Sequence, residues 1–247
     1  MARIARIVIP GIPHLVTQRG NRREQVFFED GDYQLYTDFI LEAAAKANCE
    51  VWGFCWMPNH THTILVPKDE DGLRKTFADA HRRYTAHINN RLKVTGHLWQ
   101  GRFGSVALDE DHIKHALHYV SLNPVRAKLV KKPQQWKWSS VSRHLNNEND
   151  RAFKATPALK RIGNFKSFIA TKVKDETYKL LRSGETVGRP AGDLEWLKKL
   201  EKKTGRKIIP NKRGPKPKAK KPIAIAKPVK KTILPTPKAM EQFSFDL

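Results

Sequence analysis

The sequence has few cysteines, few acidic residues and no long run of apolar residues. Only two of its 247 residues are cysteines, which excludes a disulfide-stapled scaffold and favours a reducing compartment. Cys49 and Cys55 lie six residues apart, and we interpret both as core filler of a single strand. No segment approaches the roughly 20 apolar residues that span a bilayer, and the N-terminus is too short in its apolar part for a secretory signal. We therefore expect a cytoplasmic protein with no membrane partner.

The shortage of acidic residues leaves the chain strongly basic. There are 24 Asp and Glu residues against 47 Lys and Arg residues, a formal net charge of +23. Such an excess points to a polyanionic partner, most of all nucleic acid. Between Lys198 and Lys231 the chain has fifteen lysines and arginines but one acidic residue, Glu201. Prolines interrupt this run, which argues against an amphipathic helix lying on a membrane surface.

Hydrophobic periodicity predicts an α+β fold. Strands are expected at residues 14–19, 50–57, 60–66 and 103–108. Helices are expected at residues 32–48, with Asp30 or Asp32 as cap, at 71–91, and from Asp109 or Asp111 to about Leu122. Asn123-Pro124 should end the last helix and start a short second one at 125–130. This order suits a ferredoxin-like antiparallel sheet with helices packed on it.

The composition changes after residue 147, which predicts four segments. Residues 1–147 are expected to form the α+β domain, and 148–208 a small helical extension with helices near 165–181 and 193–203. Residues 209–241 are rich in lysine and proline and should form a disordered basic tail, because they cannot bury enough apolar surface to fold. The last six residues, 242–247, become apolar again.

Two histidines, His60 and His62, lie two residues apart in the third expected strand. Residues i and i+2 of a strand point to the same face, so the two imidazoles would form a two-ligand platform for a metal ion. The alternative is a strand with two partly exposed histidines. A short His-x-His pattern does not decide between these interpretations.

Tyr119 and Asn123 are four residues apart on the expected helix and could share one face. If that face meets His60 and His62, two nitrogens and one amide oxygen would suit Mg²⁺ or Mn²⁺ more than structural zinc. The ion would polarise a scissile phosphate, and Tyr119 would attack the phosphorus. The alternatives are that Tyr119 is a core residue and that Asn123 serves only as a helix cap before Pro124.

Three blocks of sequence resemble the signature motifs of the HUH single-strand transposases, and most of all their REP-associated tyrosine transposase branch. They are Met57-Pro58-Asn59-His60-Thr61-His62, Trp99-Gln100-Gly101-Arg102-Phe103 and the stretch from His118 to Ala127, within a similarity that spans residues 12–145. The resemblance implies that His60, His62 and Asn123 bind the metal. It also implies that Tyr119 cuts single-stranded DNA, leaving a 5′-phosphotyrosine and a free 3′-OH, and that hairpins of repeated palindromes are recognised. Thr61 departs from the pattern, which usually has a bulky apolar residue there.

Candidate DNA contacts lie both in the expected domain and in the tail. Basic side chains could hold the DNA backbone and hairpin loop, and Trp99 or Phe103 could stack on a base. The tail resembles basic Gly-Pro segments that follow a minor groove. The candidates are Arg19, Asn21, Arg22, Arg82, Arg83, Trp99, Arg102, Lys212, Arg213 and Lys216.

The C-terminal hexapeptide resembles the peptide by which bacterial proteins dock on the replication sliding clamp. That peptide has a glutamine followed by alternating large apolar residues, which here would be Gln242, Phe243, Phe245 and Leu247. The alternative is an apolar tail without a partner.

Together these features predict a metal-dependent single-strand DNA transposase or endonuclease with a tyrosine nucleophile, associated with a bacterial nucleoid. A non-catalytic nucleic-acid-binding module or repressor on the same sheet is one alternative. A relaxase or replication initiator with the same nucleophile is another. The sequence leaves open whether the protein acts as a monomer or as a homodimer.

Overall fold

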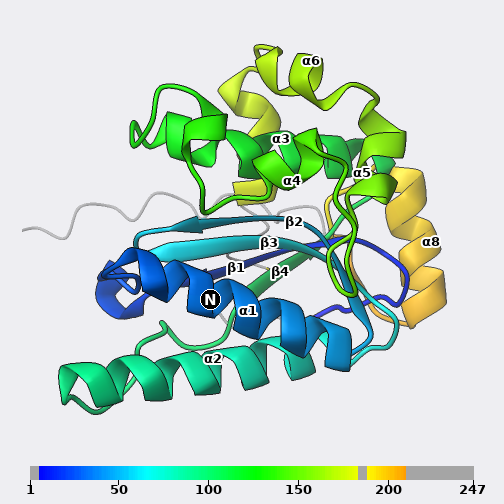
Figure 1. The fold of residues 1–247 in the computed structure, drawn as a ribbon. Helices are drawn as coiled ribbons and strands as arrows, with labels where there is room; N and C mark the ends of the chain where they lie inside the picture. Colours follow the sequence, from blue (N-terminus) through cyan, green and yellow to red (C-terminus); the bar gives the residue numbers. More distant parts are fainter. Residues whose placement is uncertain (1–5, 183–187, 210–247) are drawn as a thin grey trace, which may run out of the picture. The chain divides into compact units, whose positions relative to one another are not determined.

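A four-stranded antiparallel sheet organises the computed structural model, which describes residues 6–182 and 188–209 (Figure 1). The strands lie in the order β2-β3-β1-β4, which is the ferredoxin-like arrangement and confirms the predicted fold class. All neighbouring strands pair antiparallel. The strands are β1 (His14–Arg19), β2 (Cys49–Met57), β3 (His60–Pro67) and β4 (Gly104–Ala107).

The register of the sheet determines which side chains flank the two histidines. β2 and β3 form the predicted hairpin, with Met57 paired to His60 across the turn. β1 pairs with the other edge of β3, so that Thr17 lies opposite His62 and Arg19 lies opposite His60. Paired residues project to the same face of the sheet. Each histidine therefore has a neighbour from both adjacent strands.

Helices cover both faces of the sheet (Figure 1). On one face, α1 (Asp30–Lys46) and α2 (Gly72–Leu92) enclose a core that includes Trp56 and Leu65. On the other face, α3 (Glu110–Arg126) packs over Ile64 and Val66. Because side chains alternate along a strand, His60 and His62 share the face of Ile64 and point toward α3.

The helix caps agree only in part with the sequence-based prediction. The N-cap residue of α1 is Glu29, so the prediction of Asp30 as the cap is wrong, whereas Asp32 caps the helix as the third residue of a capping box with Glu29. Asp32 lies in the first turn and accepts a hydrogen bond from the Glu29 backbone N–H at 3.2 Å. At α3 the prediction is confirmed, because the Asp109 side chain accepts the backbone N–H of His112 at 2.8 Å.

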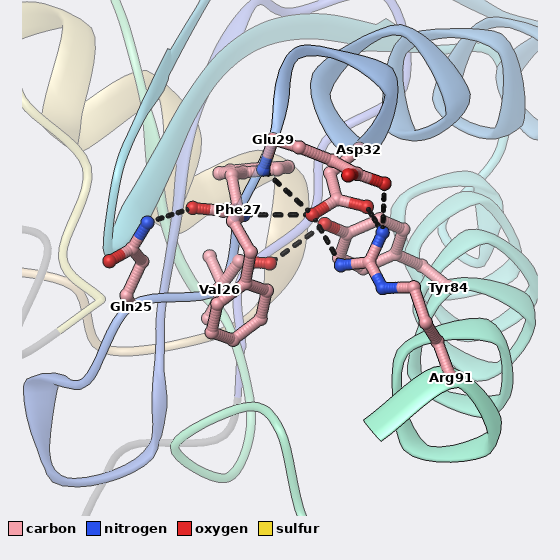
Figure 2. A network of polar contacts seen from close by, with 8 residues as sticks. Gln25, Val26, Phe27, Glu29, Asp32, Tyr84 and Arg91 are labelled. Carbon is pink, nitrogen blue, oxygen red and sulfur yellow. Dashed lines mark hydrogen bonds and ion pairs between the residues drawn. The ribbon is translucent and has the colours of Figure 1, made fainter. Parts of the chain in front are cut away.

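A buried carboxylate joins the start of α1 to the end of α2 (Figure 2). Asp32 is 1% exposed and receives two hydrogen bonds from Arg91, at 2.6 and 2.7 Å. It also accepts the backbone N–H of Phe28 at 2.8 Å. Beside it, the Tyr84 hydroxyl donates to the Val26 carbonyl at 2.7 Å. These contacts fix the loop that precedes α1 against α2.

α3 passes through the point where the sequence predicted a break. The helix includes Pro124 and ends at Arg126, so the prediction of a second helix at 125–130 is wrong. Pro124 lies in the last turn, where a proline removes one backbone hydrogen bond and leaves the earlier turns intact. The Pro124 carbonyl then accepts the N–H of Leu129 at 2.9 Å, which closes the C-terminus. Tyr119 and Asn123 consequently lie on successive turns of one continuous helix.

The segment after α3 forms short helices that pack mainly on the α3 side of the sheet (Figure 1). The helix predicted at 165–181 is divided, and the one predicted at 193–203 is confirmed with Asp193 as its N-cap. These elements are η2 (Pro133–Gln135), α4 (Val141–Leu145), α5 (Ala155–Ile162), α6 (Phe165–Ala170), η3 (Asp175–Tyr178) and α8 (Leu194–Thr204).

Part of the sequence-based scheme falls outside the described residues. The basic tail with Lys212, Arg213 and Lys216 and the hexapeptide with Gln242, Phe243, Phe245 and Leu247 lie there, and the predicted segment boundaries stay predictions. Among the described helices, none is both long and apolar enough to cross a membrane.

Candidate active site

His60 and His62 form a close pair on β3, in which His60 is partly buried and His62 is fully buried. Their ring centroids are 4.9 Å apart, and His62 is 1% exposed. Burial, helped by the charge of Arg19, lowers the pKa of His60 to about 4. Burial, followed by the charges of His60, Arg19 and Arg126, holds the pKa of His62 well below 6.5. Both rings are therefore neutral near pH 7 and can offer a nitrogen lone pair to a cation.

Each histidine has an oxygen atom against its Nδ1. Asn59 Oδ1 lies 2.7 Å from Nδ1 of His60, and Thr17 Oγ1 lies 3.2 Å from Nδ1 of His62. Such contacts from outside the ligand set orient metal-binding imidazoles and leave the opposite ring nitrogen as the ligand. Nε2 is thus the atom of each ring that could hold a metal.

Tyr119 lies directly beside this pair. Its ring centroid is 5.3 Å from that of His62, with the two rings nearly perpendicular, and its side chain belongs to the buried cluster under α3. The Arg126 guanidinium lies 4.8 Å from the centroid of the Tyr119 ring, about two turns further along the helix. The site therefore combines a phenol, two neutral imidazoles and one cation.

Asn123 lies one turn after Tyr119 on α3 and is mostly buried. Its Nδ2 has no hydrogen-bond partner within the described residues. Among all the residues that the structure describes, no three His, Cys, Asp or Glu side chains lie close enough together to hold a metal ion. Two imidazoles and the oxygen of a side-chain amide are a donor set that fits an open site for a divalent ion of borderline hardness.

The C-terminal extension adds groups that the sequence did not indicate. Tyr178 of η3 lies with its ring centroid 5.3 Å from that of Tyr119, and Arg126 lies 5.0 Å from the Tyr178 ring centroid. Asp175 accepts a hydrogen bond from Arg126 at 3.1 Å. The Tyr178 hydroxyl is 2.6 Å from Nδ1 of His118. No sequence pattern near residue 178 indicates that Tyr178 would lie against Tyr119. Arg126 and His118, in contrast, lie inside the third motif block and could have been proposed from it.

Some candidate DNA contacts lie around the histidines and others do not. Arg19 is opposite His60 on β1, and Asn21 and Arg22 are exposed in η1 (Asn21–Arg23), which follows that strand directly. Arg102 is exposed shortly before β4. These four stay candidates for DNA binding.

Arg82, Arg83 and Trp99 lie in the opposite layer. Both arginines are on α2, where Arg82 pairs with Asp79 at 3.0 Å and Arg83 pairs with Glu42 at 2.8 Å. Trp99 is 7% exposed and stacks on His81 at a centroid distance of 4.5 Å. Stacking of Trp99 on a base would require this ring to leave the core.

The sequence is similar to a known protein family and to a known relative. A family model described as "Transposase IS200 like" matches residues 11–123. A REP-associated tyrosine transposase of Escherichia coli (strain K12) is 26% identical over 125 residues, which are 50% of this chain and 72% of that protein.

A solved structure of a REP-associated tyrosine transposase bound to a REP hairpin resembles the fold. It has 23% identity and a TM-score of 0.52, and the match covers 62% of this chain and 94% of that chain. The match extends past the family model, and it supports the arrangement of the sheet and helices described above.

Proposed function

Because residues 11–123 belong to the IS200-like transposase family, we propose that this chain cuts and rejoins single-stranded DNA through a covalent bond to Tyr119. The membership confirms the family resemblance that the three motif blocks predicted. The observation that carries the proposal is the position of Tyr119, whose ring lies 5.3 Å from that of the neutral, buried His62. A core tyrosine would not need two neutral imidazoles and an arginine around it.

The proposed reaction transfers a phosphoryl group from DNA to the tyrosine. The Tyr119 oxygen attacks the phosphorus, the bond from phosphorus to the 3′ oxygen breaks, and a 5′-phosphotyrosine remains on the protein. The proton lost by the phenol is balanced by the proton that the departing 3′ oxygen takes up. A free phenol has a pKa of about 10, so the attack depends on the positive groups of the site. Rejoining is the same step in reverse, with a 3′-OH as the nucleophile.

A divalent cation, Mg²⁺ or Mn²⁺, would be held by Nε2 of His60, Nε2 of His62 and the side-chain oxygen of Asn123. When bound, it would polarise the scissile phosphate and stabilise charge on the leaving oxygen. Around it, Arg126 keeps a positive charge next to the attacking tyrosine. Thr17 and Asn59 keep the two imidazoles in a fixed orientation.

Hairpin DNA is the proposed substrate because of the names of the relatives. One solved relative is bound to a REP hairpin, and the Escherichia coli relative is called REP-associated. In this chain the exposed residues Asn21, Arg22 and Arg102 would contact the phosphate backbone, together with Arg19 beside the histidines.

The proposal is tested by incubating the protein with an end-labelled DNA hairpin that carries a REP-type palindrome and a single-stranded flank. We expect a labelled band at the position of the protein on a denaturing gel with Mn²⁺ or Mg²⁺ and none with EDTA. Fully duplex DNA serves as a control and should give no band. Hairpin binding without an adduct under either metal would instead support a non-catalytic binding module.

His62→Ala is expected to weaken Mn²⁺ binding by about 100-fold or more, because removal of a direct ligand should exceed the 10–100-fold loss typical of outer contacts. The measurement is a titration of free Mn²⁺ by electron paramagnetic resonance. His87→Ala is the matched control, since His87 is an exposed histidine on α2, in the other layer. Equal Mn²⁺ affinity in the two variants would contradict the assignment of His62 as a ligand.

A further inference from the structure

The turn that carries the first histidine is tied to the basic turn after β1. Asn59 Nδ2 donates to the Arg23 carbonyl at 3.0 Å, and the Gly20 N–H donates to the Asn59 carbonyl at 2.9 Å. The Pro58 carbonyl accepts the N–H of Val26 at 2.9 Å. The Pro58-Asn59 turn therefore holds residues 20–26 by three hydrogen bonds, one of which comes from a side chain.

That side chain has only one consistent orientation. A backbone carbonyl can only accept, so the Asn59 atom that faces Arg23 must be the NH₂ group. Oδ1 then faces His60 at 2.7 Å, and Nδ1 of His60 must carry the proton. Nε2 of His60 is left with its lone pair, as a metal ligand requires. The Arg23 carbonyl thus determines, through one amide, which nitrogen of His60 is available.

The basic turn itself is held in an uncommon conformation. Arg22 and Arg23 have φ of 52° and 65°, in the left-handed region that side chains other than glycine and asparagine rarely adopt. Their side chains are exposed, and neither forms an ion pair within the described residues. Strained backbone that presents unpaired cations is typical of a binding site rather than of a solvated loop.

Close packing prevents the turn from relaxing. A Cβ atom on Gly20 would lie 2.3 Å from the Glu24 carbonyl oxygen and 2.7 Å from a Val26 methyl group. The chain can therefore double back at this point only with glycine at position 20. The turn has one well-defined position, and Asn59 is the side chain that links this position to His60.

We propose that Asn59 is a positioning residue that couples the metal site at His60 to a DNA phosphate contact on the turn of Arg22 and Arg23. This inference rests on the function proposed above, which supplies the divalent cation and the DNA as the two molecules that bind. A DNA phosphate bound at Arg22 and Arg23 stabilises the turn in this conformation, and the Asn59 amide transmits that stabilisation to the orientation of His60 that the metal requires. Because coupling between two sites is reciprocal, a bound metal strengthens DNA binding by the same factor.

Three variants separate this coupling from a local effect on the histidine. Asn59→Ala removes both hydrogen bonds of the side chain. Asn59→Asp keeps an acceptor for His60 but places a second acceptor against the Arg23 carbonyl. Thr17→Val removes the equivalent outer contact of His62 and leaves the turn untouched. Thermal denaturation of each variant serves to check that it is folded.

Two affinities are measured on each full-length protein, without reference to cleavage. Mn²⁺ affinity is measured in the absence of DNA, and the affinity for a fluorescein-labelled DNA hairpin with a single-stranded flank is measured in EDTA. Asn59→Ala should lose about 10-fold or more in Mn²⁺ affinity and about 5-fold in hairpin affinity, as expected for one lost hydrogen bond. Asn59→Asp should lose hairpin affinity alone. Thr17→Val should lose Mn²⁺ affinity alone.

The coupling is read from the gain in hairpin affinity that Mn²⁺ produces. In the unmodified chain this gain should be about 5-fold or more, a factor typical of coupled sites, and it should disappear in Asn59→Ala. The inference is overturned if Asn59→Ala keeps its hairpin affinity in EDTA, or if Thr17→Val loses as much of it. If the unmodified chain binds neither Mn²⁺ nor the hairpin, the proposed function fails and this inference fails with it.

Discussion

Tyr119→Phe is expected to lower formation of the covalent protein–DNA adduct by on the order of 1000-fold or more, while affinity for the hairpin changes less than about 3-fold. The substitution removes the attacking oxygen and leaves the ring that packs against His62 and Tyr178. The site keeps its shape, so DNA binding and metal binding should persist. The measurement is the rate of labelled adduct formation at saturating hairpin and Mn²⁺.

Tyr178→Phe is the matched control for this prediction. Tyr178 is the other tyrosine of the site, but its hydroxyl is 2.6 Å from His118 and burial raises the pKa of its phenol. The raised pKa disfavours the phenolate that would attack, and the loss of the Tyr178 hydroxyl should leave adduct formation within about 10-fold of the unmodified chain. An adduct that survives Tyr119→Phe but not Tyr178→Phe would reverse the assignment of the nucleophile.

The sheet could be predicted from the sequence because it depends on local alternation. The strand at residues 60–67 places His62, Ile64 and Val66 on one face and Leu65 on the other, and the structure keeps this division. The same rule explains Thr61, which departs from the family pattern. Thr61 is buried on the face opposite the histidines, so it changes the packing under α1 and α2 and leaves the site itself unchanged.

The end of α3 shows where local rules are insufficient. An Asn-Pro pair usually ends a helix, because proline disfavours the helical conformation of the preceding residue. Here the helix continues through Asn123, which is buried against the sheet together with Tyr119. The free energy of burying this face outweighs the local preference of the dipeptide. Sequence propensity contains no information about what the rest of the chain packs against that turn.

The residues of the candidate site also fall into those that local sequence rules indicate and those that depend on long-range packing. Spacing made His60 and His62, and Tyr119 and Asn123, candidate pairs, since i+2 in a strand and i+4 in a helix are local relations. The family resemblance then supplied the role of each residue. Thr17 and Tyr178 were missed, because their contacts depend on strand register and on chain folding over 45 and more residues.

The basic residues on α2 show a related limit of the sequence. Arg82 and Arg83 were interpreted as candidate DNA contacts from their charge. The structure shows their partners, Asp79 and Glu42, which no count of charges could assign. Any DNA contact by these arginines would first have to replace those ion pairs, so their role in binding stays a prediction.

Asp32→Ala is expected to lower the free energy of unfolding by about 3 kcal/mol or more, because it removes the buried acceptor of two backbone N–H groups and leaves Arg91 with its exposed partner Glu29. Arg91 would lose two hydrogen bonds, and the backbone N–H groups of Phe28 and Glu29 would lose theirs (Figure 2). Denaturation in urea measures the change. The loss is a large fraction of the stability of an ordinary domain, so the variant should unfold at a much lower urea concentration.

Asp30→Ala is the matched control, since Asp30 lies on the same turn and pairs with Lys137 where both side chains are 66% exposed. Exposed pairs contribute less than about 1 kcal/mol.

The pH dependence of stability gives a second test of Asp32. Burial acts to raise the pKa of its carboxyl, but hydrogen bonds from Arg91 and from the backbone outweigh this effect and hold the pKa below its ordinary value of 3.8. A lowered carboxyl pKa stabilises the fold above the unfolded value, and this contribution disappears as the pH falls below about 4. The unmodified chain should therefore lose more stability than Asp32→Ala between pH 6 and pH 3, and parallel curves would contradict the assignment.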